Sequence, residues 1–168
     1  MTEKGDIRIV ILSDTHGDRR VIERVIAQEE PFDYLIHCGD AEIDLSEYAD
    51  PAKPYELLAV RGNCDYYSDL PAAINTQLGG LNVLITHGHH ENVHSGVQAL
   101  AEAGRSLEAD LIFYGHTHIP EIAEEGGILI INPGSPVYPR GLRRQRTYAV
   151  LTVSGKQERN AVIKTVKD

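Results

Sequence analysis

Residues 7–17 read IRIVILSDTHG, and this stretch decides the fold. Its first six residues are apolar and mostly β-branched, apart from Arg8, which predicts a short strand buried on both faces. The strand is followed at once by Asp14 and His16, two side chains that can ligate a metal, and then by Gly17. A buried strand that ends in polar ligands and glycine is therefore the pattern to seek along the rest of the chain.

A helix and a second strand follow this stretch directly. A stretch that begins at Asp18 or Arg19 and ends at Glu30 places four aliphatic side chains on one helical face, and Pro31 follows its end. Residues 34–37 read YLIH and predict another buried strand, which is closed by Gly39. Since strand, helix and strand follow in this order, we expect a right-handed crossover between two parallel strands.

The later half of the chain is richer in hairpins than in helices. We expect a third strand at residues 57–60, a helix at 95–107 with Leu107 on its inner face, and a strand at 111–114. Glycine-containing turns predict three hairpins, which pair residues 73–78 with 81–86, 119–123 with 128–132, and 147–153 with 158–166. This mixture favours an α/β fold in which two packed sheets are flanked by helices, within one domain spanning residues 1–168.

The composition is that of a soluble globular protein, with 42% hydrophobic and 24% charged residues. Residues 1–6 are charged and lead straight into the first strand, without the apolar segment of a signal peptide. No apolar run is long enough to span a bilayer. Two cysteines, Cys38 and Cys64, are too few for a disulfide framework. We therefore expect a cytoplasmic protein without a membrane partner.

The formal net charge of −9 argues against broad electrostatic binding to nucleic acid. A basic cluster interrupts this acidic background at Arg140, Arg143, Arg144 and Arg146. We interpret the cluster as a solvated loop, because four cations on an otherwise acidic chain are weak support for a nucleic-acid site.

Five predicted strands end in residues that can ligate a metal, each close to a glycine. The endings are residues 13–17 (SDTHG), 37–40 (HCGD), 61–65 (RGNCD), 86–90 (THGHH) and 114–118 (YGHTH). Any one of them alone is better explained as a capped turn or a buried histidine. Strand ends in an α/β domain converge on one crevice, however, and glycine lets loops approach a common centre. Together the five endings predict a single metal site.

The ordered series of motifs resembles that of the calcineurin-like metallophosphoesterases, and more narrowly that of their small single-domain bacterial and archaeal phosphodiesterase branch. The motifs are Asp14-x-His16, Gly39-Asp40, Gly62-Asn63, Thr86-His87-Gly88-His89 and Gly115-His116-x-His118. A loop with the sequence Asn132-Pro133-Gly134-Ser135 strengthens the narrower match, so the resemblance runs from about residue 7 to residue 135. It implies a four-layer α/β/β/α sandwich with a site for two metals at the strand ends.

The resemblance also implies a ligand set and a reaction. One divalent metal would be held by Asp14, His16, Asp40 and His118, and the second by Asp40, Asn63, His87 and His116. Asp40 would bridge the two ions, because each carboxylate oxygen offers lone pairs. The implied reaction is phosphodiester hydrolysis by a hydroxide that bridges the metals, with Asp40, Asn63 and His89 closest to the chemistry. Mn²⁺ suits these oxygen and nitrogen ligands, as do Fe²⁺, Ni²⁺, Co²⁺ and Zn²⁺.

The chain departs from many larger relatives at Cys64, where they have a histidine that can protonate the leaving group. A thiol of ordinary pKa is a poor general acid, so His89 or a metal-bound water would have to replace it. Asp65 fits a turn cap as well as a residue that orients a ligand. His37 is expected to be structural, and His90 and His94 to belong to a loop.

Other functions stay open at this point. The same fold serves as a protein-interaction scaffold in the small subunit of retromer, and a phosphomonoesterase or a nuclease would use the same metals. The complete ligand set favours catalysis on a small phosphate ester. Edge strands in the late hairpins would allow a homodimer. Specificity is expected in residues 44–55, 66–71 and 137–146, none of which names a substrate.

Overall fold

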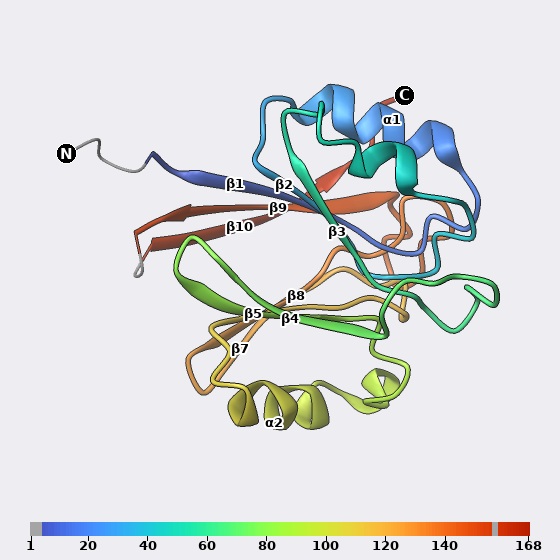
Figure 1. The fold of residues 1–168 in the computed structure, drawn as a ribbon. Helices are drawn as coiled ribbons and strands as arrows, with labels where there is room; N and C mark the ends of the chain where they lie inside the picture. The colour runs from blue at the N-terminus through green and yellow to red at the C-terminus, as the bar shows by residue number, and fades with distance from the viewer. Residues whose placement is uncertain (1–4, 156–157) are drawn as a thin grey trace.

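The computed structural model describes residues 5–155 and 158–168. It shows two five-stranded sheets packed face to face, with helices on their outer faces (Figure 1). The strand order is β10-β9-β1-β2-β3 in the first sheet and β4-β5-β6-β8-β7 in the second, and both sheets mix parallel with antiparallel pairs. This architecture confirms the predicted α/β/β/α sandwich.

The elements alternate between helix-linked strands early in the chain and hairpins later. The strands of the first sheet are β1 (Ile7–Leu12), β2 (Tyr34–His37), β3 (Glu56–Ala59), β9 (Thr147–Ser154) and β10 (Glu158–Thr165). Those of the second are β4 (Ala73–Leu78), β5 (Leu81–Thr86), β6 (Leu111–Phe113), β7 (Glu121–Glu125) and β8 (Ile128–Asn132). The helices are α1 (Arg19–Glu29), α2 (Gln98–Ser106) and the short 3₁₀ helices η1 (Ser46–Ala49) and η2 (Val93–Ser95).

Strand β1 explains why its sequence is apolar without a break. Ile9 and Ile11 pack into the core between the two sheets, whereas Val10 and Leu12 pack under α1. Side chains alternate between the two faces of a strand, so a strand that is covered on both faces needs apolar residues at every position. The same alternation in β5 and β6 places the second sheet between the central core and α2.

Parallel pairing determines where the functional residues gather. Strands β1, β2 and β3 run parallel in the first sheet, and β5, β6 and β8 run parallel in the second. The loops that leave the carboxyl ends of parallel strands emerge at the same edge of their sheet. All five predicted polar endings follow one of these strands, so the topology brings them to two facing sheet edges (Figure 1).

Two predicted elements differ from those observed by more than one residue at an end. The second helix begins at Gln98 rather than at residue 95 and ends at Ser106, so Leu107 caps the helix and is 40% exposed instead of buried. Strand β7 lies two residues later than predicted, because the turn closes at Gly126 and Gly127 alone. Both glycines have positive φ angles, of 59° and 82°, as a tight two-residue hairpin turn requires.

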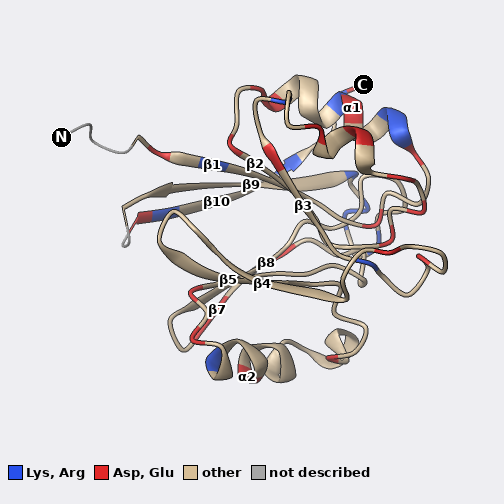
Figure 2. Cartoon of the chain, viewed as in Figure 1, with Lys and Arg blue, Asp and Glu red and all other residues tan. Residues whose placement is uncertain are grey.

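Charged side chains lie mainly on the outer elements and loops, and the paired sheets between them are largely uncharged (Figure 2). Across the described residues, no helix combines the length and apolarity that crossing a membrane would take.

One buried charge fastens α1 to the first sheet. Glu29 is only 3% exposed and lies at the end of the helix. Its carboxylate accepts hydrogen bonds from Arg8 on β1 and from the hydroxyl of Tyr148 on β9, and it pairs with Lys164 on β10. A carboxylate is tolerated at this depth because cations and donors surround it.

Replacing Glu29 with Gln should therefore lower the free energy of unfolding by about 2 kcal/mol, because the hydrogen bonds to a charged acceptor are lost. Urea unfolding followed by far-ultraviolet circular dichroism measures the change. Glu23→Gln is the matched control, since Glu23 is exposed on the same helix and should change stability by less than about 0.5 kcal/mol. Equal losses in the two variants would contradict this role for Glu29.

Candidate metal centre

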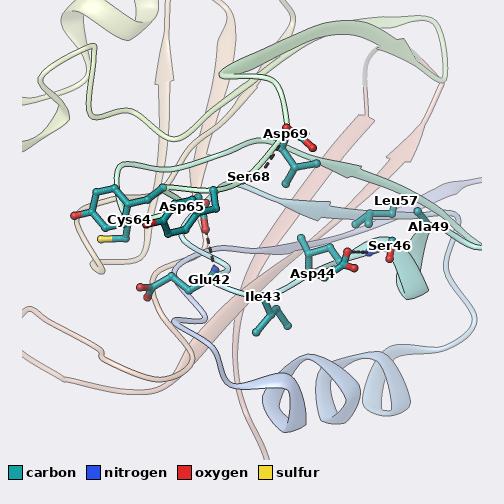
Figure 3. A pocket seen from close by; sticks show the side chains of 14 residues that line it. Glu42, Ile43, Asp44, Ser46, Ala49, Leu57, Cys64, Asp65, Ser68 and Asp69 are labelled. Carbon is teal, nitrogen blue, oxygen red and sulfur yellow. Dashed lines mark hydrogen bonds between the residues drawn. The ribbon is translucent and has the colours of Figure 1, made fainter.

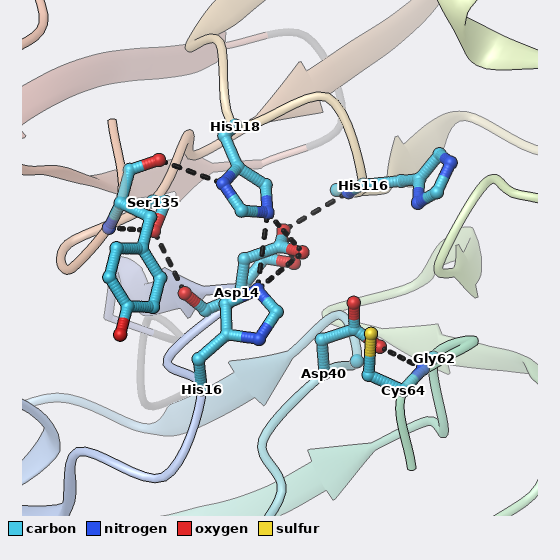
Figure 4. A network of polar contacts seen from close by, with 12 residues as sticks. Asp14, His16, Asp40, Gly62, Cys64, His116, His118 and Ser135 are labelled. Carbon is cyan, nitrogen blue, oxygen red and sulfur yellow. Dashed lines mark hydrogen bonds and ion pairs between the residues drawn. The ribbon is translucent and has the colours of Figure 1, made fainter. Parts of the chain in front are cut away.

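A first group of side chains meets at the carboxyl ends of β1 and β6 (Figure 4). His118 Nε2 lies 3.2 Å from Asp14 Oδ1 and 3.2 Å from His16 Nε2. One ligand atom from each of these three residues lies within 4.8 Å of the other two, which is the spacing needed to hold one ion. Residues more than a hundred positions apart are thus neighbours in the fold.

A second group lies beside the first. His87 Nε2 is 3.3 Å from Asp40 Oδ2, 3.2 Å from His116 Nδ1 and 3.0 Å from the side-chain oxygen of Asn63. Asp40 also lies close to the first group, because one of its carboxylate oxygens is within 4.8 Å of a ring nitrogen of His16. The structure therefore brings together all seven residues predicted as ligands and places Asp40 in contact with both groups.

Three of the four histidines are held by a hydrogen bond on the ring nitrogen that faces away from the centre. These bonds join Nδ1 of His87 to the carbonyl of Cys38 at 2.7 Å, Nδ1 of His118 to the carbonyl of Tyr138 at 2.7 Å, and Nδ1 of His16 to Glu42 Oε2 at 2.6 Å. Because carbonyl and carboxylate oxygens only accept, each Nδ1 carries the proton. Nε2 is then the nitrogen that faces the centre, and in the neutral form of each ring its lone pair can bind a metal.

The unpaired atoms at the centre fit a cation. Asp14 is fully buried, and its Oδ1 has no hydrogen-bond partner among the described residues. That oxygen faces the Nε2 atoms of His118, His16 and His87 at 3.2, 3.8 and 3.9 Å. Lone pairs that converge in this way repel one another unless a positive charge lies between them. Carboxylate, amide and imidazole donors at such distances suit divalent transition metals.

The carboxylates of the centre stay ionised. Burial opposes ionisation of Asp14, but His118, whose Nε2 faces the carboxylate, and the charge of His87 hold its pKa below the usual value. For Asp40 the opposing effect is again burial, and His87 together with the Cys64 backbone N–H at 2.8 Å lowers the pKa well below the ordinary range. Two negative charges are therefore available to bind cations at neutral pH.

The histidines of the centre differ in the direction in which their pKa values are shifted. Burial and the neighbouring His87 and His94 lower the pKa of His116 to about 4, so this ring is neutral at pH 7. Burial works against protonation of His87 as well, but its hydrogen bond to Asp40 and the charge of Asp14 raise its pKa overall. A metal would have to displace that proton, so metal binding at this site should weaken as the pH falls.

The backbone at the ligand positions is unusual. Five of the seven ligand residues have φ in the left-handed region, at 57° for Asp14, 41° for His16, 56° for Asp40, 72° for His116 and 60° for His118. Non-glycine residues seldom adopt this region, and the strain costs roughly 1 kcal/mol or more at each position. Hydrogen bonds between the loops compensate, including those from the N–H of Asp14 to Gly39 and of His16 to Asp40.

Two glycines of the motifs are required by close contact. A Cβ atom at Gly115 would lie 1.9 Å from Ser13 Oγ and 2.7 Å from Asp14 Oδ2. At Gly62 it would lie 2.1 Å from Asp40 Oδ1. No side chain fits at either position without displacing a carboxylate of the centre, which explains why the polar endings carry glycine.

The other histidines and Cys64 lie around this set. The His89 ring centre is 5.3 Å from that of His87, and its buried Nδ1 has no hydrogen-bond partner among the described residues. The Cys64 sulfur lies within ligand distance of His16 and Asp40, and burial followed by the charge of Asp40 raises its pKa to about 11. His37 is structural, as predicted, since its ring bonds Thr15 at 2.9 Å in the interior.

Three supporting residues were missed by the sequence analysis. Glu42 bonds His16, Ser13 Oγ donates to Asp14 Oδ2 at 2.6 Å, and the carbonyl of Tyr138 holds His118. Glu42 and Ser13 lie next to predicted metal-binding motifs. Their position beside a predicted ligand could have indicated that they support it. The contact through Tyr138 has no signal in the sequence, because any residue supplies a backbone carbonyl.

Asp65, whose role the sequence left open, organises the loop around Asp40. Its carboxylate accepts the backbone N–H groups of Asp40 and Glu42 at 2.8 Å each and of Gly62 at 2.7 Å. The residue therefore closes its own turn and also positions the Asp40 carboxylate. The turn cap is thereby confirmed, and orientation of a metal ligand by Asp65 stays a prediction.

The matched family is now clear from comparison with known proteins. The model of the calcineurin-like phosphoesterase superfamily domain matches residues 7–156. The chain is 34% identical over 148 residues to a probable metallophosphoesterase, YsnB, of Bacillus subtilis, covering 88% of this chain and 85% of the relative. It is 30% identical over 178 residues to a phosphodiesterase of Methanocaldococcus jannaschii, covering 94% and 99%. The chain belongs to the calcineurin-like phosphoesterase superfamily.

Solved structures agree with this assignment. A predicted phosphoesterase from Streptococcus pneumoniae superimposes with a TM-score of 0.78 at 28% identity, over 95% of this chain and 99% of that one. Vacuolar Protein Sorting 29 from Cryptosporidium parvum gives a TM-score of 0.76 at 16% identity, over 95% and 97%. The first supports a shared phosphoesterase fold and family, whereas the second shows the fold alone.

Replacing Asp65 with Asn should weaken binding of Mn²⁺ roughly tenfold or more, because an amide group cannot accept all three backbone N–H groups and the Asp40 loop loses its position. Titration followed by electron paramagnetic resonance of free Mn²⁺ measures the affinity. Asp69→Asn is the control, since Asp69 is exposed in the same loop and should leave the affinity unchanged. Unchanged affinity in Asp65→Asn would show that the loop holds its shape without this carboxylate.

Proposed function

We propose that the protein is a metal-dependent phosphodiesterase that hydrolyses its substrate with a hydroxide bridging two divalent ions. The observation that supports this most directly is the convergence of seven donors from five loops, with the buried Asp14 oxygen left for a cation. Asp14, His16, Asp40 and His118 would hold one ion, and Asp40, Asn63, His87 and His116 the other. Homologues named phosphodiesterase support hydrolysis of a diester.

The charges of the ligands suit a phosphodiester. Two divalent ions would bring four positive charges, and Asp14 and Asp40 return two, while Asn63 and the histidines are neutral ligands. When bound, the ions supply a hydroxide nucleophile at neutral pH and positive charge for the phosphoryl oxygens. A bridging hydroxide would lower the remaining charge from two to one, which still attracts a monoanionic diester, and an aspartate in place of Asn63 would cancel it. Mn²⁺ is the proposed metal, consistent with mixed oxygen and nitrogen donors.

His89 is proposed to contact the substrate phosphate. Burial and the nearby His90 lower its pKa, so the ring is neutral at pH 7 and offers one N–H donor. Its unpartnered Nδ1 is consistent with a partner that arrives with the substrate. Cys64 remains a thiol at neutral pH and is proposed to take no part in proton transfer.

The proposed function is tested with bis-p-nitrophenyl phosphate and metal-stripped protein, assayed with and without Mn²⁺. Turnover should depend on the metal and should fall at least about a hundredfold in Asn63→Ala, because the second ion loses a ligand. Asn75→Ala, at an exposed position of β4, should behave as the parent protein. No turnover with any divalent ion, despite two bound metals, would overturn the proposal in favour of a binding scaffold.

Cys64→Ala separates the thiol from the chemistry. The variant should retain more than about half of the turnover on bis-p-nitrophenyl phosphate, because p-nitrophenolate leaves without protonation by the enzyme. Initial rates at saturating Mn²⁺, with bound metal counted in the same samples, provide the measurement. Near-complete loss of turnover with metal still bound would mean that Cys64 has a catalytic role.

The rates of hydrolysis of bis-p-nitrophenyl phosphate, p-nitrophenyl phosphate and a DNA duplex decide between a diesterase, a monoesterase and a nuclease. We propose a small diester, since the acidic chain opposes a polyanion. Cytoplasmic location, a single domain over residues 1–168 and a homodimer stay predictions.

A further inference from the structure

A cavity opens beside the candidate metal centre, lined by the segments that follow β2 and β3 (Figure 3). Its volume is about 750 Å³, which is within the range of small-molecule sites in proteins. Two of its lining residues also contact the centre. The Cys64 sulfur lies within ligand distance of His16 and Asp40, and Glu42 is bonded to His16. A molecule with its phosphate at the metals would therefore extend into this cavity.

The charged groups of the cavity are all acidic. Glu42, Asp44, Asp65 and Asp69 line it, and none of the described residues in the lining is lysine or arginine. Asp65 is occupied by three backbone N–H groups, whereas Asp44 and Asp69 are exposed, and Asp44 accepts one backbone N–H, from Ser46 at 2.9 Å. A second negative charge on a ligand would face these carboxylates with no lysine or arginine among the described lining residues, whereas an uncharged group would meet no such repulsion.

The remaining lining is apolar and aromatic. Leu45 is buried and Leu70 half-buried, so they offer an apolar wall. Tyr66 and Tyr67 are 82% and 101% exposed, although tyrosine rings of soluble domains usually find more cover. Exposed aromatic rings on a cavity beside a reactive centre are suited to stack against a planar ring of a ligand.

We propose that this cavity binds one ester group of the substrate, and that this group is uncharged, carries a planar heteroaromatic ring and has the size of a nucleoside. The proposal rests on the proposed function in one respect, since it places the scissile phosphate at the metals. Stacking on the tyrosines selects the ring, and the carboxylates select against a further phosphate.

Calorimetric titration of the Mn²⁺-loaded protein with three phosphate monoesters tests the proposal. Thymidine 5′-phosphate should bind roughly tenfold or more tightly than methyl phosphate, because only the former fills the cavity. Thymidine 3′,5′-bisphosphate should bind more weakly than thymidine 5′-phosphate, since its second phosphate meets the carboxylates. Equal affinity for methyl phosphate and thymidine 5′-phosphate would overturn the proposal.

Variants assign these differences to the cavity. The double variant Tyr66→Ala/Tyr67→Ala should lose roughly tenfold in affinity for thymidine 5′-phosphate and nothing for methyl phosphate. Leu142→Ala, at a fully exposed position outside the cavity, should change neither. Asp44→Asn/Asp69→Asn should bind the bisphosphate more tightly than the parent does. Full affinity in the tyrosine variant would contradict the stacking role.

The outcomes also separate this inference from the proposed function. Turnover of bis-p-nitrophenyl phosphate without any preference among the three ligands would overturn the cavity proposal and leave the diesterase standing. The ligand preference without turnover would support the cavity and overturn the catalytic proposal. The bisphosphate could instead bind more tightly than thymidine 5′-phosphate and lose that advantage in Arg143→Ser. This outcome would overturn the cavity proposal and assign the second phosphate to the basic cluster that contains Arg143.

Discussion

The structure depends on the buried carboxylate of Asp14. This group lies at the end of the first strand, is fully shielded from solvent and remains ionised. An isolated charge at such depth would cost several kcal/mol, so its partners must be in place. Ser13 beside it supplies one, and the others come from the second sheet: the backbone N–H of His116 donates to one oxygen at 3.0 Å, and His118 faces the other. Asp14 thereby fixes the position of one sheet edge against the other.

This constraint explains why the ligand loops tolerate strained backbone. Left-handed φ angles at five ligand residues are individually unfavourable, but each turns a side chain toward the space between the sheets. The strain is offset by contacts that exist only when both sheets are packed, such as the bond from Ser135 Oγ to the carbonyl of Asp14. Packing of the three apolar layers thus offsets the backbone strain in the loops of the centre.

Much of the fold was predictable because burial leaves a periodic trace. The strand at residues 7–12 is apolar at every position since it is covered on both faces, and its polar ending follows immediately. The exposed Leu107 was mispredicted because helical periodicity continues past the point where the backbone stops being helical. Hairpin turns were placed well by glycine, but the start of β7 was not, since nothing in its sequence marks the first paired residue.

The sequence predicted the residues nearest the proposed metal positions best, and the residues that support them less well. Predicted ligands such as His87 follow strands and belong to an ordered series, so the sequence indicated all of them together. Asp65 was ambiguous because one carboxylate both closes a turn and positions Asp40, and only coordinates show the three N–H groups that it accepts. The hydrogen bond from His118 to the carbonyl of Tyr138 could not be predicted, since any residue can supply a backbone carbonyl.

Charge on this molecule acts on two length scales, and the shorter one governs recognition. The net charge of −9 repels anions at a distance, but salt at physiological strength screens that field beyond about 8 Å. At contact the substrate phosphate would meet the two proposed metal ions, whose attraction would outweigh the distant surface charge. The acidic cavity lies next to this centre, where screening is weak, so Asp44 and Asp69 oppose a second anionic group on the same ligand. The proposed arrangement would let an acidic protein hold one phosphate firmly and still discriminate against a substrate that carries two.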